Sequence, residues 1–280
     1  MASPSAPFSR LLLVTQGTKF DTGAEQVALA MATRGGVRLL AVFPVVSNPE
    51  YVTLAPELEQ KAEVHAARIL TELRREASQQ NLEIETRVRL GEEPYIEVVD
   101  EASKQKIDLI VMRTRGKRGL MARLLVGENV AKVIGHARCS VLVVPRKAHM
   151  WKKRVLLATD GSRFSVAAAA VAGAMAKWYQ LPVTVISVVT DSHIKEVRAE
   201  ASDAIERALD MLRRERVTAA GKVVDGWPHE ALIGAAEAFG ADLIVVGSHG
   251  RTGLEKVVMG STAERVIGLA KCPVLVVKHK

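Results

Sequence analysis

The sequence predicts an α/β protein made of two doubly wound domains in tandem, each with a five-stranded parallel sheet flanked by helices. Hydrophobic residues make up 48% of the 280 residues but aromatic residues only 4%, so the cores must be aliphatic. Short apolar, β-branched runs alternate with helical patterns, and this alternation occurs twice. Parallel strands covered on both faces give such runs, and right-handed crossover helices connect them.

An internal repeat defines the expected domains. The segment RLLLVTQGT at Arg10 matches RVLLATDGS at Arg154, DLIVM at Asp108 matches DLIVV at Asp242, and CSVLVV at Cys139 matches CPVLVV at Cys272. The same order in both copies indicates two homologous units. We therefore expect domains at residues 1–148 and 152–280, with a linker near 147–152. The first copy has about ten extra residues, which we assign to the polar stretch 47–56.

The second copy shows its elements clearly. Ser162 can cap a first helix that runs to about Lys177, and a charged helix follows at 192–214. A third helix is expected near Pro228, because proline suits a first helical turn, and a fourth at Ser261. The expected strands are 154–159, 183–189, 217–224, 242–247 and 274–278.

A glycine-rich loop follows the fourth strand of the second copy. Gly247 and Gly250 are followed, after nine residues, by Gly260 and Ser261. Glycines let backbone N–H groups approach a ligand, and a helix that begins at Ser261 offers unpaired N–H groups and a positive dipole end to phosphate. Asp160 ends the first strand, at the edge of the sheet where such folds bind ligands, and can hold a ribose hydroxyl or a phosphate-bound metal.

This spacing, G-x2-G-x9-G-[S/T], resembles the nucleotide-binding pattern of the universal stress protein family, as do the segments ATDGS and CPVLVVK. The resemblance implies the strand order 3-2-1-4-5, an ATP-binding stress-response regulator, and ATP (ADP and AMP being alternatives) between strands one and four. It assigns Asp160 to the ribose and to the phosphates with their Mg²⁺. It places Val188 and Val246 beside the base. The implied ribose and phosphate contacts are Gly247, Gly250, Gly260, Ser261 and Thr262.

The first copy departs from the pattern at several positions. Arg113 replaces the first glycine, Gln16 replaces the aspartate, and Glu128 replaces the serine, while the gap from Gly116 to Gly127 holds ten residues. Each change opposes ATP, by bulk, by loss of a carboxylate or by repulsion of phosphate. We therefore expect nucleotide in the C-terminal domain only. The local cations can bind another anion or an acidic partner, or form a solvated loop: Arg113, Arg115, Lys117, Arg118 and Arg123.

Other enzyme classes find little support. The sequence lacks a P-loop, a Rossmann glycine fingerprint after the first strand, zinc-type Cys/His spacing and a nucleophile elbow. His249 is interpreted as loop structure, so no catalytic residue is assigned. Two alternatives to the nucleotide-binding regulator stay open: a slow ATPase in which metal and Asp160 assist water, and an interaction scaffold whose ATP is structural.

Composition limits the partners and the compartment. The net charge of +8 is spread evenly, which favours a soluble basic protein over a nucleic-acid binder. We see no signal peptide and no membrane-spanning run, and expect a cytoplasmic protein. Cys139 and Cys272 are expected in the cores, without a disulfide framework. The resemblance implies domain pairing through segments 141–145 and 274–278 as an intrachain pseudo-dimer, with a homodimer and an unknown protein partner left open.

Overall fold

The computed structural model describes residues 6–114, 127–190, 195–251 and 259–279, without the side chains of Pro49, Tyr51 and Leu54. The chain forms two compact units that follow the two copies of the repeat. Residues 8–115 and 128–150 form the first unit, and 151–280 make up most of the second.

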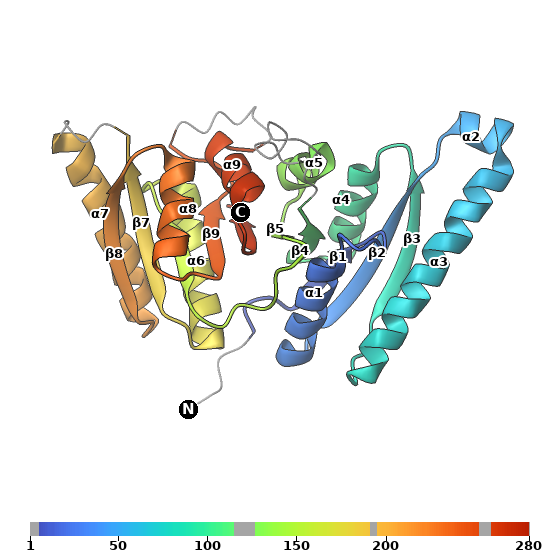
Figure 1. The fold of residues 1–280 in the computed structure, drawn as a ribbon, viewed down its shortest axis with the longest axis horizontal. Coiled ribbons are helices and arrows are strands. Elements are labelled where there is room, and N and C mark those ends of the chain that lie inside the picture. Colours follow the sequence, from blue (N-terminus) through green and yellow to red (C-terminus); the bar gives the residue numbers. More distant parts are fainter. Residues whose placement is uncertain (1–5, 115–126, 191–194, 252–258, 280) are drawn as a thin grey trace. The chain divides into compact units, whose positions relative to one another are not determined.

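The first unit contains a parallel five-stranded sheet in the order β3-β2-β1-β4-β5. Helix α1 contacts β1 and β4, whereas α4 and α5 contact each other (Figure 1). Its elements are β1 (Arg10–Val14), α1 (Thr22–Gly35), β2 (Arg38–Val46), α2 (Pro49–Leu54), α3 (Pro56–Gln79), β3 (Glu85–Gly91), α4 (Pro94–Lys104), β4 (Leu109–Arg113), α5 (Glu128–His136) and β5 (Ser140–Val144).

The second unit repeats this arrangement, with its parallel strands in the order β10-β9-β6-β7-β8. Helices α6 and α7 contact each other, as do α8 and α9. Its elements are β6 (Val155–Ala158), α6 (Arg163–Tyr179), β7 (Val183–Val189), α7 (Lys195–Arg214), β8 (Ala219–Asp225), α8 (Pro228–Ala238), β9 (Leu243–Gly247), α9 (Ser261–Leu269) and β10 (Val274–Val277). Both the predicted fold class and the strand order 3-2-1-4-5 are confirmed.

Local signals in the sequence explain several element boundaries. The Ser162 hydroxyl accepts a hydrogen bond of 3.2 Å from the Ser165 backbone N–H, so the predicted cap of α6 is present. Pro228 occupies the first position of α8. Helix α2 lies within the stretch 47–56 that was expected to hold the additional residues of the first copy.

Both cores are aliphatic, as the composition predicted. The central strands bury their side chains almost completely, and Leu12 and Leu157 have no exposed surface. Trp151 is an aromatic exception, 1% exposed, and its ring packs edge-on against Tyr179. Cys139 is buried and Cys272 is half-buried, and neither forms a disulfide. Burial raises the pKa of the Cys272 thiol to about 11, so this thiol stays protonated near neutral pH.

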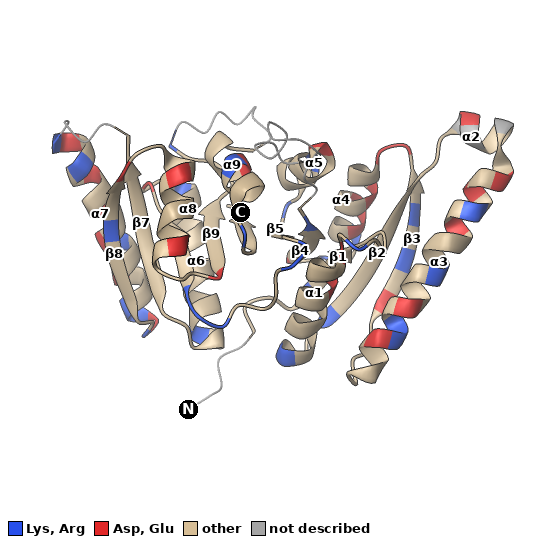
Figure 2. Cartoon of the chain, viewed as in Figure 1, with Lys and Arg blue, Asp and Glu red and all other residues tan. Residues whose placement is uncertain are grey.

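Charge collects on helices, loops and outer strands, while the inner strands are almost free of it (Figure 2). Strand β3 carries Arg87 and Arg89, which contact the buried Glu101 carboxylate of α4 at 2.5 and 3.4 Å. Strand β8 carries Lys222. Charged side chains on outer strands discourage pairing with a foreign strand. In the described part of the chain, no helix combines the length and the apolar character that crossing a membrane requires.

Candidate functional site

A pocket opens at the carboxyl ends of β6 and β9 in the second unit and encloses about 220 Å³. All the site residues predicted from the sequence line it: Asp160, Val188, Val246, Gly247, Gly250, Gly260, Ser261 and Thr262. Segments more than 80 residues apart in the chain meet here because the carboxyl ends of parallel strands lie at one edge of the sheet. Their binding role stays a prediction that this placement supports.

The Asp160 carboxylate joins two loops of this pocket. One oxygen accepts a hydrogen bond of 3.0 Å from the Ser162 N–H, and the other accepts one of 2.9 Å from the Arg251 N–H. The Arg251 side chain also donates to the Asp160 carbonyl oxygen and pairs with Glu200 of α7 at 2.5 Å. Two backbone N–H groups therefore fix the direction of the carboxylate. Each oxygen retains capacity for a further hydrogen bond.

The pocket glycines are required first by packing. A Cβ at Gly247 would lie 2.9 Å from the backbone carbonyl carbon of Phe164 in α6, and one at Gly250 would lie 3.0 Å from an Asp160 oxygen. A Cβ at Gly260 would lie 3.3 Å from the Ser248 carbonyl oxygen, to which the Gly260 N–H donates a 3.0 Å hydrogen bond. Close packing within the strand–loop–helix turn therefore favours glycine at these positions, independently of any ligand.

Helix α9 directs its N-terminus at the pocket. Ser261, Thr262 and Ala263 form its first turn and line the cavity, and the N-cap residue Gly260 has no side chain to cap them. Unpaired N–H groups at a helix start attract anions. On the other side lie the apolar side chains of Ile186, Val188, Pro228 and Leu232. The pocket thus joins an apolar wall to a phosphate-compatible end.

Several lining residues were not identified from the sequence. Pro228 and Leu232 lie four positions apart on α8 and face the cavity together. Ser165 and Thr159 are buried below Asp160, with their hydroxyls 3.2 Å apart. The spacing of Pro228 and Leu232 could have identified them from the sequence. Ser165 could not be identified in this way, because its position depends on where α6 begins.

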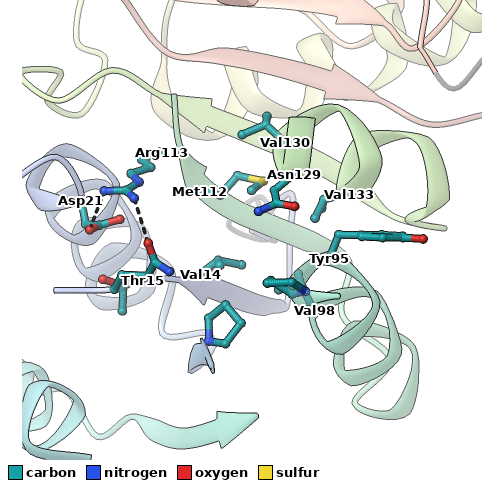
Figure 3. Close-up of a pocket in the computed structure, with 13 residues that line it drawn as sticks. Val14, Thr15, Asp21, Tyr95, Val98, Met112, Arg113, Asn129, Val130 and Val133 are labelled. Atoms are coloured by element: carbon teal, nitrogen blue, oxygen red, sulfur yellow. Dashed lines mark hydrogen bonds and ion pairs between the residues drawn. The ribbon is translucent and has the colours of Figure 1, made fainter. Parts of the chain in front are cut away.

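The first unit has a smaller pocket of about 70 Å³ at the same edge of its sheet (Figure 3). Arg113, the residue in place of Gly247, extends its guanidinium over the loop after β1. It donates to the Gln16 side-chain oxygen at 2.9 Å and pairs with the Asp21 carboxylate at 3.1 Å. The Arg113 side chain is 12% exposed and that of Asp21 is 2% exposed. An internal ion pair thus lies where the second unit has open backbone.

The helix that follows the first strand also begins at a different position in the two units. Helix α6 begins at Arg163, whereas α1 begins at Thr22, three residues beyond the equivalent Lys19. In the second unit this first turn of helix is what a Cβ at Gly247 would meet. The later start of α1 leaves room for the Arg113 side chain, and Asp21, now the N-cap residue, meets it. Relative to the second unit, Arg113, its partner Asp21 and the later start of α1 therefore depend on one another.

The other substitutions in the first copy affect its pocket less directly than Arg113 does. The Glu128 side chain is 77% exposed and pairs with Lys132 at 3.0 Å, so this carboxylate does not line the pocket. The expected repulsion of phosphate by Glu128 is thus weakened by distance and solvent. Of the cationic cluster, Arg113 is ion-paired rather than solvated. The other members, Arg115, Lys117, Arg118 and Arg123, lie outside the described residues.

Binding of a metal ion in the large pocket would require a ligand that brings further oxygen atoms. Within the ranges that the structure describes, no group of three or more His, Cys, Asp or Glu side chains is arranged to hold a metal ion. Among the described residues that line the large pocket, Asp160 is the one that offers a carboxylate. This fits a cation that arrives on phosphate oxygens, since Mg²⁺ commonly binds through one carboxylate, phosphates and water.

Comparison with known proteins identifies the class. The model of the universal stress protein family matches residues 7–145 and 152–278, so the chain belongs to this family. It is a tandem member, with one family domain in each half.

Individual relatives agree with this assignment. A universal stress protein of Methanocaldococcus jannaschii is 37% identical over 139 residues, covering 45% of this chain and 82% of the relative. One from Bacillus subtilis is 30% identical over 145 residues, covering 45% of this chain and 98% of the relative. The crystal structure of a universal stress protein from Archaeoglobus fulgidus has a TM-score of 0.79 at 19% identity, over 99% of this chain and 98% of that one. This last similarity shows a shared fold.

Proposed function

We propose that this tandem universal stress protein is a nucleotide-binding regulator that holds ATP in its C-terminal domain only. The observation that carries the proposal is the pocket of about 220 Å³, which gathers every site residue chosen from the sequence beside the uncapped start of α9. Val188 and Val246 would face the base, and Asp160 would accept a ribose hydroxyl. Gly250, Gly260, Ser261 and Thr262 would donate to the phosphates.

Mg²⁺ would enter with the phosphates, where Asp160 could reach it through water. ADP and AMP use the same base and ribose contacts and stay alternatives. The first domain is proposed to be closed to ATP because the Arg113–Asp21 pair occupies the position of the open glycine turn.

Hydrolysis has less support than binding. Asp160 and His249 are the titratable side chains among the described lining residues. Asp160 accepts two backbone hydrogen bonds, and the His249 ring lies against Phe164 and 3.1 Å from the Ser248 hydroxyl. Neither is arranged as a dedicated general base, so the slow ATPase stays the weaker candidate. A structural role for ATP in a scaffold uses the same contacts.

A matched pair of substitutions tests the proposal. In isothermal titration of the full chain with Mg-ATP, we expect about one site per chain from the asymmetry of the two pockets. Asp160→Ala should weaken binding about tenfold or more, the loss expected for a charge-assisted hydrogen bond. Gln16→Ala, the same position of the first copy, should leave affinity unchanged.

The control separates binding from folding. Asp160→Asn retains an oxygen for the Ser162 N–H and should preserve the loop while it removes the charge. Two equivalent sites per chain, or equal affinity in Asp160→Ala and Gln16→Ala, would falsify the asymmetric assignment.

A further inference from the structure

The small pocket of the first unit retains the apolar wall of the large one. Positions equivalent in sheet register and in the first turns of α4 and α8 are apolar in both pockets. Val14, Pro44, Pro94, Val98 and Met112 take the places of Ala158, Val188, Pro228, Leu232 and Val246. The first domain therefore keeps a surface suited to the flat face of a ring.

The charged end of the same pocket is neutralised from within. Arg113 would be the natural cation for a phosphate or carboxylate, but its guanidinium is already held by Asp21 and Gln16. An anion would have to compete with a nearly buried carboxylate, at a high cost in free energy. The pocket thus favours an uncharged ligand.

Asn129 is a polar side chain of this wall that can recognise a ligand. Asn129, in the place of Thr262, directs its amide between Met112 and Val133, whereas the Tyr95 ring is turned away (Figure 3). The Asn129 side chain has no hydrogen-bond partner among the residues that the structure describes. A primary amide both donates and accepts, so its complement is a neighbouring N–H and C=O on one edge of a ligand.

We propose that the N-terminal domain binds a small, uncharged ring compound with an amide edge, held by Asn129 against the apolar wall. A cavity of about 70 Å³ admits about five to seven atoms of water size, which matches a simple lactam. This site is separate from the nucleotide proposed for the other domain, and neither proposal requires the other.

The test is a methyl and amide NMR titration of the full chain with 2-pyrrolidinone. We expect saturable shifts at Val14, Val98, Val133 and Asn129. Asn129→Leu should weaken binding about tenfold, the loss expected for two neutral hydrogen bonds in part exposed to water. Thr262→Leu, the matched change in the other pocket, should leave the titration unchanged.

Matched probes define the chemistry. Cyclopentanone, which lacks the N–H, and pyroglutamate, which adds a carboxylate, should both bind more weakly than the lactam. Val98→Phe fills the cavity and should abolish the shifts, while unchanged methyl signals from Leu70 and Leu73, core residues of the same domain that do not line the pocket, show that the variant remains folded. The proposal is overturned by absent or non-saturable shifts, by unchanged affinity in Asn129→Leu, or by tighter binding of pyroglutamate.

Discussion

Single residues decide the difference between the two pockets. The exchange of Gly247 for Arg113 adds a side chain and a charge, which the fold accommodates only because Asp21 and Gln16 bind that charge. A buried arginine left without its carboxylate would be strongly destabilising. The closed pocket is therefore a stable local structure with its own contacts.

Glu25, in the first turn of α1, gives a prediction about pH. Burial raises the pKa of Glu25, the hydrogen bond from Thr15 opposes the shift, and nearby Asp21 and Glu76 add to it. A carboxyl group whose pKa is raised on folding favours the native state below its ordinary pKa and loses this contribution as the pH rises through the folded pKa. Glu25→Gln should therefore raise Tm by a few degrees at pH 7 and by nothing at pH 4.

Thermal unfolding of the variant at both pH values checks this. Glu63→Gln, at an exposed glutamate of α3 that is not among the groups acting on Glu25, is the matched control and should change Tm little. A Glu25→Gln variant that is less stable at pH 7 than the original chain would show that the ionised carboxylate stabilises the fold.

At the scale of elements, one aspartate in each domain holds the start of the first strand. These are Asp108, just before β4, and Asp242, just before β9. Asp242 accepts backbone N–H groups of Lys152, Lys153 and Arg154 at 2.6, 2.9 and 3.0 Å. Asp108 accepts those of Ser9 and Arg10 at 2.7 and 3.0 Å. The repeat comparison aligned these two residues, but their role appears only when the strands are adjacent.

Asp242→Ala should therefore lower the free energy of unfolding of the second domain by about 1.5–3 kcal/mol, the value of hydrogen bonds to a charged group. Urea unfolding measures this. Asp203→Ala, an exposed aspartate on α7, should change the free energy by about 0.5 kcal/mol or less. If both variants lose the same stability, the capping role of Asp242 is wrong.

At the scale of the whole molecule, the repeat produces two domains of one fold with unequal pockets. Ligands stabilise only the unit that they bind, so ATP at about 100 times its Kd should stabilise the second domain by about 2.7 kcal/mol. The pairing of the domains through segments 141–145 and 274–278, the oligomeric state and the cytoplasmic location stay predictions.

Hydrogen exchange measured on peptides of the full chain tests whether ATP stabilises only the second domain. Added Mg-ATP should slow exchange in peptides around Asp160 and residues 259–269, and leave those around Gln16 and Glu128 unchanged. The nucleotide-free chain is the reference for each peptide. Equal protection in both halves would contradict a single nucleotide site.

The sequence alone determined the two-domain α/β fold and part of the lining of the large pocket, because the repeat, the apolar runs and the glycine spacing are local patterns. The strand order followed from the resemblance to the family. The sequence also marked the first copy as altered. Only the tertiary structure showed how: Asp21, overlooked in the sequence, pairs with Arg113, which lies 92 residues further along the chain, while the suspected Glu128 faces solvent. Such pairings depend on side-chain direction and on where α1 begins, and neither is encoded by spacing along the chain.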